Sequence, residues 1–271
     1  MIILKKSLAI STSILLLLLP FVSQAEDGKA FLTLGGGVAF APAYQGADKY
    51  RPTAIYDINV GYGHGDWGSV SLGNNGLSWA LPLDEPFGVA LLLDYDSGRD
   101  EVIKTLDGRD KTLKGMGDLG GTLQAGVELS YQLDPFRTYI KALQATKKRH
   151  YGGEDLGRTL LAELGVGTIT PLNDQFSLQT NLSTTWANSG YQRGYFGVTP
   201  EQAQRTAFST WRPGSGFKDV TFSAALNYEW TQNIALQAGA GVTALVGDAA
   251  KSPIVEKKVA GLSFVSASYS F

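Results

Sequence analysis

The stretch that decides the fold is residues 119–133, LGGTLQAGVELSYQL. Its odd-numbered positions are Leu, Gly, Leu, Ala, Val, Leu, Tyr and Leu, and its even-numbered positions are Gly, Thr, Gln, Gly, Glu, Ser and Gln. Successive side chains of a strand point to opposite faces, so this alternation predicts one apolar face and one polar or small face. Strands of soluble sandwiches have about five or six residues, whereas tilted transmembrane strands have about 9–11. The stretch therefore predicts a strand of a membrane β-barrel.

The same period of two returns along the chain, in residues 176–186, 220–230 and 234–246. Several of these stretches carry an aromatic residue at or near the end of the apolar face: Tyr131, Trp186, Tyr228 and Trp230. Such positions fit the aromatic girdles that lie at the two membrane interfaces of outer-membrane barrels. The repeated pattern predicts an all-β, antiparallel transmembrane barrel in a single domain.

Twelve strands are expected, at residues 31–40, 53–62, 67–73, 77–81, 87–96, 119–132, 136–146, 159–170, 176–186, 220–230, 234–246 and 261–271. The third and fourth are short and joined by Asn74-Asn75-Gly76, a plausible tight turn, so ten strands is the alternative. An even count places both termini in the periplasm. The longer loops would then be extracellular, at residues 98–118, 147–158, 187–219 and 247–260.

Residues 1–25 have the composition of a secretory signal peptide. Lys5 and Lys6 precede an apolar stretch at residues 8–22, and Ser23-Gln24-Ala25 is a small-residue cleavage site. Cleavage after Ala25 would leave a mature barrel of residues 26–271. That mature chain has no apolar run of about 20 residues, which argues against helical membrane spans. The expected location is the outer membrane, in contact with its lipid.

Charge and residue counts argue against several classes of function. Loss of Lys5 and Lys6 leaves 21 basic residues against 25 acidic ones, with no basic block suited to nucleic acid. The chain has no cysteine, and its two histidines, His64 and His150, are predicted at opposite ends of the barrel. His64 forms only a weak triad-like grouping with Asp66 and Ser69. We therefore predict no enzyme, no metal site and no cofactor.

The polar face carries one cluster of charges. The turn at Asp134-Pro135 sets Glu128 opposite Lys141, and the alternation points both into the barrel. Glu163 on the next strand also points inward. Two interpretations stay open for this cluster. It constricts or plugs the lumen or selects among permeating solutes, or it is a structural ion pair that neutralises partly buried charge.

The longest loop, residues 187–219, has local order of its own. Thr199 as N-cap, Pro200 at the first helical position and Gln202 three residues after the cap predict a short helix reaching about Arg205. Aromatic side chains give the loop apolar surface with which to pack: Tyr191, Tyr195, Phe196, Phe208, Trp211 and Phe217. The loop is expected to act as a lid, a binding surface or a structural plug.

Several blocks resemble the MipA/OmpV family of outer-membrane proteins. They are LGGGVAFAPAYQGAD at 34–48, RPTAIYDINVGYG at 51–63, DYDSGRD at 94–100, YFGVTPEQAQRTAFSTWRPGSGFKDV at 195–220, AGAGVTALVGDAAKSPIV at 238–255 and the closing SASYSF. The resemblance implies an outer-membrane barrel. The family's name-giving member is a scaffold between a murein transglycosylase and a murein synthase, and other members are linked to adhesion, osmotic response or antibiotic susceptibility. The family supplies no catalytic residues to carry over.

The last strand resembles the C-terminal signature of bacterial outer-membrane proteins, which the barrel-assembly machinery recognises. Its apolar positions end in Tyr269 and Phe271, with serines between them. Three functions stay open: a scaffold for murein-synthesising and murein-hydrolysing proteins, a narrow pore for small solutes, and an adhesin acting through its extracellular loops. The scaffold rests on the family resemblance and is the first expectation.

Overall fold

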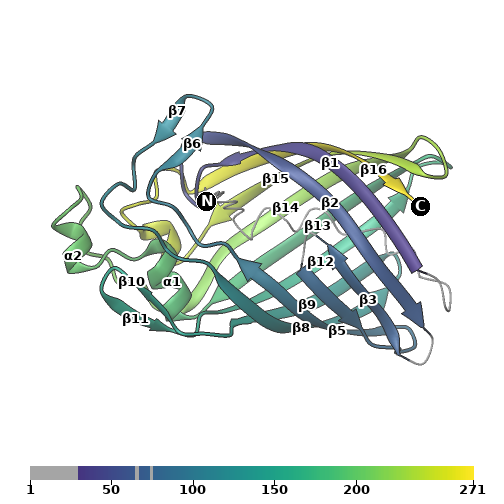
Figure 1. The fold of residues 1–271 in the computed structure, drawn as a ribbon, viewed down its shortest axis with the longest axis horizontal. Coiled ribbons are helices and arrows are strands. Elements are labelled where there is room, and N and C mark those ends of the chain that lie inside the picture. The colour runs from purple at the N-terminus through teal and green to yellow at the C-terminus, as the bar shows by residue number, and fades with distance from the viewer. Residues whose placement is uncertain (1–29, 65–66, 74–75) are drawn as a thin grey trace, which may run out of the picture.

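In a computed structural model, the chain forms a closed barrel of twelve antiparallel strands (Figure 1). The structure describes residues 30–64, 67–73 and 76–271. The predicted signal peptide and Asn74-Asn75 of the predicted turn lie outside these residues. The barrel closes where β1 (Ala30–Pro42) pairs with β16 (Val259–Ser270), from Thr33 opposite Ser270 to Phe40 opposite Ser263. The twelve-strand interpretation is confirmed and the ten-strand alternative is wrong.

The other barrel strands follow in chain order. They are β2 (Tyr50–His64), β3 (Gly68–Gly73), β4 (Gly76–Ala80), β5 (Phe87–Asp96), β8 (Thr122–Leu133), β9 (Phe136–Ala145), β12 (Leu160–Pro171), β13 (Phe176–Ala187), β14 (Gly216–Glu229) and β15 (Ile234–Leu245). The largest differences from the sequence prediction are the earlier starts of β2 and β14 and the later start of β8, at Thr122 instead of Leu119. The starts of β2 and β14 are earlier because backbone pairing continues beyond the last clearly alternating side chain.

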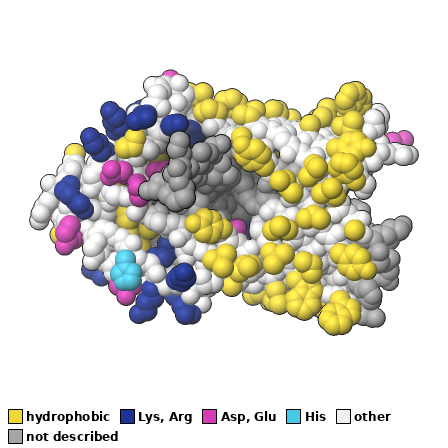
Figure 2. All heavy atoms as spheres, viewed as in Figure 1, with side chains coloured by type: hydrophobic (Ala, Val, Ile, Leu, Met, Phe, Trp, Pro, Cys, Tyr) yellow, Lys and Arg dark blue, Asp and Glu magenta, His cyan; other side chains and the backbone are white. Residues whose placement is uncertain are grey.

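Lipid-facing and lumen-facing side chains alternate as the sequence predicts. In β8, Leu123, Leu129 and Tyr131 are 42%, 50% and 40% exposed on the outer face, whereas Thr122 and Gln124, on either side of Leu123, are buried. Figure 2 shows the resulting apolar side chains spread over the visible face of the barrel wall. Exposed apolar surface of this extent is unfavourable in water and favourable in hydrocarbon. The outer face is therefore built to contact lipid.

The inner face is narrowed by aromatic side chains that lie over glycines of the neighbouring strand. Tyr139 of β9 covers Gly165 of β12, where a Cβ atom on the glycine would lie 2.3 Å from the tyrosine ring. Phe264 of β16 covers Gly239 of β15 in the same way, at 2.5 Å. Glycine is required at these positions because the ring occupies the space that any side chain would need.

The two ends of the barrel differ. At the turn end the strands are joined by short segments, residues 65–67, 81–86, 134–135, 172–175 and 230–233. At the loop end the connections are longer and contain the hairpins β6–β7 (Ile103–Thr105, Gly108–Asp110) and β10–β11 (Arg149–Tyr151, Glu154–Gly157), the helices α1 (Ser189–Phe196) and α2 (Pro200–Ala203), and the 3-10 turn η2 (Ala249–Lys251). None of the helices in the described part of the chain is long and apolar enough to cross a membrane.

Replacing Gly165 tests the aromatic–glycine packing. Gly165→Val should lower the free energy of unfolding by about 1–3 kcal/mol, because the new side chain displaces the Tyr139 ring. The matched control is Gly36→Val, at an outward-facing strand glycine whose Cβ would meet only Ile55 O at 3.6 Å. Urea titration of the protein refolded in vesicles measures both, and equal stability of the two variants would contradict this packing account.

Candidate functional site

The long connections at the loop end pack together into one cap rather than lying as separate loops. Three buried aromatic side chains of α1, Tyr191, Tyr195 and Phe196, form its centre. Their neighbours in the same core come from every other long connection and the strand ends: Leu119, Tyr151, Leu156, Ala187, Leu245 and Ala249. This core therefore joins segments from around the barrel at the loop end.

Helix α1 begins at an Asn cap that sequence analysis missed. The Asn188 side chain accepts a hydrogen bond from Tyr191 N at 2.9 Å and donates one to Arg158 O at 2.9 Å. The Asn cap was visible in the sequence, but Gly190 and Gly194 lower the intrinsic helix propensity of this stretch. Gly190 is required by tertiary packing, since a Cβ there would lie 2.2 Å from Leu156 O.

The predicted helix start at Thr199 is present. Thr199 and Gln202 form a reciprocal capping box with Pro200 in the first turn, but α2 ends at Ala203, before the predicted end near Arg205. Gln202 is fully buried and donates to Met116 O at 2.8 Å, which fixes α2 to the 97–121 connection.

Two residues expected in the same loop have different environments. Trp211 pairs with Val198 through backbone hydrogen bonds and packs against a second buried cluster that includes Leu113 and Met116. The expectation that Phe217 belongs to the lid is wrong. This residue lies in β14 and is 52% exposed, because the strand begins at Gly216 and not at Val220.

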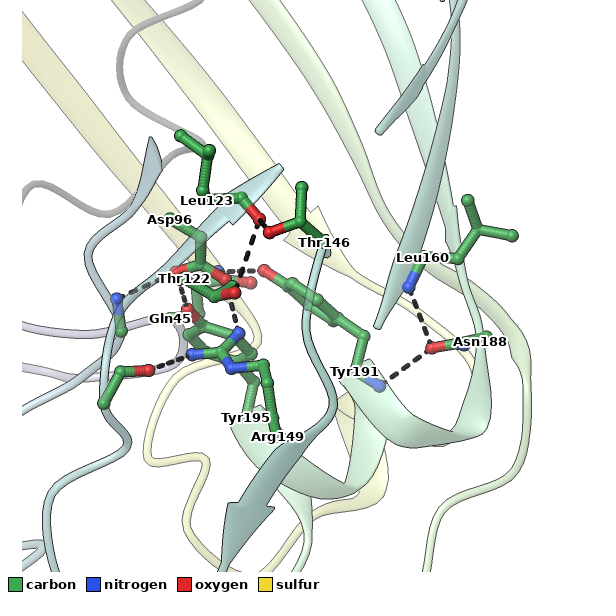
Figure 3. Close-up of polar contacts among 12 residues, drawn as sticks. Gln45, Asp96, Thr122, Leu123, Thr146, Arg149, Leu160, Asn188, Tyr191 and Tyr195 are labelled. Atoms are coloured by element: carbon green, nitrogen blue, oxygen red, sulfur yellow. Dashed lines mark hydrogen bonds and ion pairs between the residues drawn. The ribbon is translucent and has the colours of Figure 1, made fainter. Parts of the chain in front are cut away.

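A buried ion pair ties the cap to the barrel wall. Asp96, at the end of β5, accepts from Arg149 of β10 at 2.6 Å, and the two side chains are 1% and 4% exposed (Figure 3). Asp96 also accepts from Tyr195 Oη of α1 and from Gly98 N at 2.8 Å. Arg149 donates its second Nη to Gly120 O at 2.6 Å. One carboxylate therefore holds a strand end, a hairpin and a helix together.

Electrostatics favour the charged form of this pair. Burial alone would lower the pKa of Arg149, but the charge of Asp96 and the neighbouring Tyr195 raise it overall. The pKa of Tyr195 lies well above its ordinary value, chiefly because the phenol is buried and also because Asp96 is adjacent. Arg149 thus stays cationic and Tyr195 stays a neutral donor, which is the arrangement the Asp96 carboxylate needs.

Arg99 makes a second tie within the cap. This buried residue donates to Tyr195 O at 2.6 Å and to Tyr151 Oη at 2.9 Å. The sequence analysis singled out none of the residues Asp96, Arg99 and Arg149. The DYDSGRD segment was noted only for its family resemblance, and only the fold brings it to the β10–β11 hairpin.

The interior charges form two separate ion pairs. Lys141 lies 3.4 Å from Glu163 on the neighbouring strand, and Tyr139 Oη donates to the same carboxylate at 2.7 Å. Glu128 lies opposite Lys141 in the strand register, yet its ion pair is with Arg137 at 2.5 Å. The long Arg137 side chain reaches back along the same face, while Lys141 is held by Glu163.

The lumen is hollow at the turn end. A cavity of about 290 Å³ is lined by polar and aromatic side chains that include Arg137, Tyr139, Gln179 and Asn181. Gln179 and Asn181 come from β13, whose inward positions were predicted to be polar. The described part of the barrel therefore has a polar cavity toward the turns and a packed cap toward the loops.

The histidines and the last residues take no part in the cap's ion pair, although His150 directly follows Arg149 in β10. His64 ends β2, not a turn as expected, and its grouping with Asp66 falls outside the described residues. His150 is exposed on β10, with its Nε2 3.9 Å from Asp155. Within residues 30–64, 67–73 and 76–271, no group of three or more metal-binding side chains occurs. Tyr269 and Phe271 are exposed, with ring centroids 4.7 Å apart; their role in assembly remains a prediction.

Loss of the Asp96 carboxylate should open the cap. Asp96→Asn leaves Arg149 buried without its counter-ion, so the free energy of local opening should fall by about 3–5 kcal/mol. Hydrogen exchange of amides in residues 146–159 and 188–215 measures this opening. Asp155→Asn, which removes an exposed ion pair with Lys148, is the control and should change little. Unchanged protection in Asp96→Asn would mean that the ion pair does not hold the cap.

Comparison with known proteins places the chain in a family. Among solved structures, it is similar to the NanC porin, with 11% sequence identity over 88% of this chain and 98% of that chain and a TM-score of 0.45. It is also similar to the CymD monoaromatic hydrocarbon channel, with 14% identity over 97% of this chain and 94% of that chain and a TM-score of 0.44. An outer membrane channel from Pseudomonas putida F1 is similar with 12% sequence identity, over 93% of this chain and 99% of that chain, and a TM-score of 0.45. No curated protein matches significantly. The family model of MltA-interacting protein MipA matches residues 34–271, and the chain therefore belongs to the MipA family of outer-membrane β-barrel proteins.

Proposed function

We propose that the protein is a non-conducting outer-membrane barrel whose turn end faces the periplasm and anchors murein-remodelling enzymes. The observation that carries this proposal is the cap. An open pore needs a continuous water path, and the core around α1 and the Asp96–Arg149 pair pack together at the loop end, which supports a barrel that does not conduct. The family is named for interaction with MltA, and the resemblance noted in the sequence implies a murein transglycosylase and a murein synthase as partners.

The turn end offers an acidic rim to such a partner. The exposed charged residues of the described turns are all acidic: Asp84, Glu85, Asp134 and Asp174, joined by Glu229 at an adjoining strand end. Arg137, at another adjoining strand end, is 37% exposed and is paired with Glu128. Lys and Arg side chains gather instead at the loop end, as Figure 2 shows. A ring of like charges attracts a basic surface and repels an acidic one, which gives a partner both an approach direction and selectivity.

The shape of the turn end limits the kind of contact. The turns are short, so a partner would meet a flat ring of charges and the cavity mouth rather than a projecting loop. Exposed charges contribute little each and are screened by salt. We therefore expect a moderate, salt-sensitive association, suited to a scaffold that gathers enzymes and releases them.

A narrow channel is the second candidate. The turn-end cavity and the charged inner face with Glu128 and Lys141 favour it, because polar side chains around an empty lumen suit permeating solutes. A channel would need the cap to move, whereas a scaffold would not. No catalytic role is proposed for the barrel.

The rim predicts a specific binding defect. A variant with Asp84, Glu85, Asp134, Asp174 and Glu229 changed to their amides should bind a purified murein transglycosylase about tenfold more weakly at low salt. The matched control neutralises five exposed loop-end carboxylates: Asp48, Asp107, Asp118, Asp155 and Glu201. Surface plasmon resonance with the barrel in nanodiscs measures both. Equal loss in the two variants, or none in the rim variant, would contradict docking at the turn end.

A further inference from the structure

The turn-end cavity has the size and the lining of a small binding site. Its volume is about 290 Å³, and its lining comes from β8, β9, β12, β13 and the Asp134-Pro135 turn. Pockets that bind small molecules begin at about 300 Å³. The cavity therefore suits one small molecule, or one terminal unit of a longer molecule, that approaches from the turn end.

One buried side chain in this lining has no partner. Gln179 of β13 is 6% exposed and lines the cavity. Its amide forms no hydrogen bond with any other group among the described residues. Because a buried amide without partners is costly, water or a ligand in the cavity must supply them. The amide offers both N–H donors and a C=O acceptor to such a ligand.

Asn181 and Arg137 add further hydrogen-bonding groups beside Gln179. Asn181 lies two residues along the same strand, is 8% exposed, and donates from Nδ2 to Tyr139 Oη at 3.3 Å. Arg137 uses one Nη for its ion pair with Glu128. A guanidinium has five N–H donors, so Arg137 keeps donors for a ligand.

An apolar edge lies next to the free amide. Ile169 of β12 is opposite Gln179 in the strand register and is 45% exposed. Pro135 also lines the cavity. A well-matched ligand would therefore carry a methyl group or a C–H face close to its own hydrogen-bonding groups.

The charges of the lining favour a neutral ligand. The lining contains two charged residues, Arg137 and Asp134, and Arg137 is neutralised by Glu128. Asp134 is exposed at the acidic rim, which repels anions. A cation would meet only this one carboxylate, which already accepts a hydrogen bond from Gln132 Nε2 at 3.0 Å.

We propose that the turn-end cavity binds an acetamido sugar, with the amide of Gln179 paired to the acetamido group. This group presents one N–H and one C=O, which match the acceptor and a donor of the Gln179 amide. Its methyl group suits Ile169, and the sugar hydroxyls suit Asn181 and the remaining donors of Arg137. This site goes beyond the scaffold role and does not depend on any protein partner.

The first test is saturation-transfer NMR of the refolded mature barrel in detergent micelles, titrated with N-acetylglucosamine. Saturable binding is expected, with strong transfer to the acetyl methyl protons. Glucose and glucosamine lack the acetamido group and should bind about tenfold more weakly, because the Gln179 amide is then left without its partner. Equal binding of glucose and N-acetylglucosamine would overturn the proposal.

The second test removes the amide of Gln179. Gln179→Leu should weaken binding of N-acetylglucosamine about tenfold without loss of stability, since a partnerless amide is replaced by an apolar group of similar size. The matched control is Gln237→Leu on β15, where the glutamine is outside the cavity lining and donates to Asn227 at 2.6 Å. Equal weakening in both variants, or none in Gln179→Leu, would contradict the assignment.

The third test fills the cavity. Ile169→Trp places a larger side chain in the lining, so binding should be lost while circular dichroism stays that of a barrel. Ile140→Trp, at a lipid-facing position of β9 that is 53% exposed, should leave binding unchanged. Binding retained in Ile169→Trp would show that the sugar binds elsewhere.

The source of the sugar is distinguished by the linear tetrasaccharide of N-acetylglucosamine, added in the same titration. Tighter binding than the monosaccharide would identify the end of a glycan chain as the occupant. Binding of the monosaccharide alone would identify a free sugar. Absence of binding by both would overturn the proposal, and, because no protein partner is present, it would leave docking of murein enzymes at the rim unaffected.

Discussion

The constraint on which the structure depends is that backbone hydrogen bonds in hydrocarbon must be made within the protein. The pairing of β1 with β16 removes the two edges that an open twelve-stranded sheet would leave. Once the sheet is closed, the period of two assigns each side chain to lipid or to the lumen. The apolar band, the polar lumen and the glycines beneath Tyr139 and Phe264 all follow from this closure.

Charge within the lumen follows a second constraint, because ions taken out of water need partners. Lys141 with Glu163 and Arg137 with Glu128 satisfy each other inside the wall. In the cap, Asp96 serves three donors from three segments, so its carboxylate couples the barrel to its closure. The same logic makes Gln179 informative, since its buried amide departs from the pattern of satisfied groups around it.

Much of the barrel could be predicted from the sequence because strand alternation is local. The pattern in residues 119–133 places Glu128 inward, and Thr199 with Pro200 gives a helix start, without any knowledge of the fold. The cap's ion pair could not be predicted in this way, since Asp96 and Arg149 are far apart in the chain. Glu128 shows the same limit of sequence-based prediction. The sequence correctly placed Lys141 opposite Glu128 in the strand register, but the ion pair of Glu128 is with Arg137 and depends on the reach of that long side chain. Phe217 was misplaced because the first residues of β14 lack clear alternation.

The most direct measurement is single-channel conductance of the refolded mature barrel in a planar bilayer. The account places a packed cap at the loop end of a closed barrel, so it predicts no ionic current from properly folded wild-type protein. Asp96→Asn, with its cap loosened, should give discrete openings under the same voltage. Stable openings in the wild type, with an ion selectivity that changes in Lys141→Glu, would contradict the closed barrel and identify the protein as a pore.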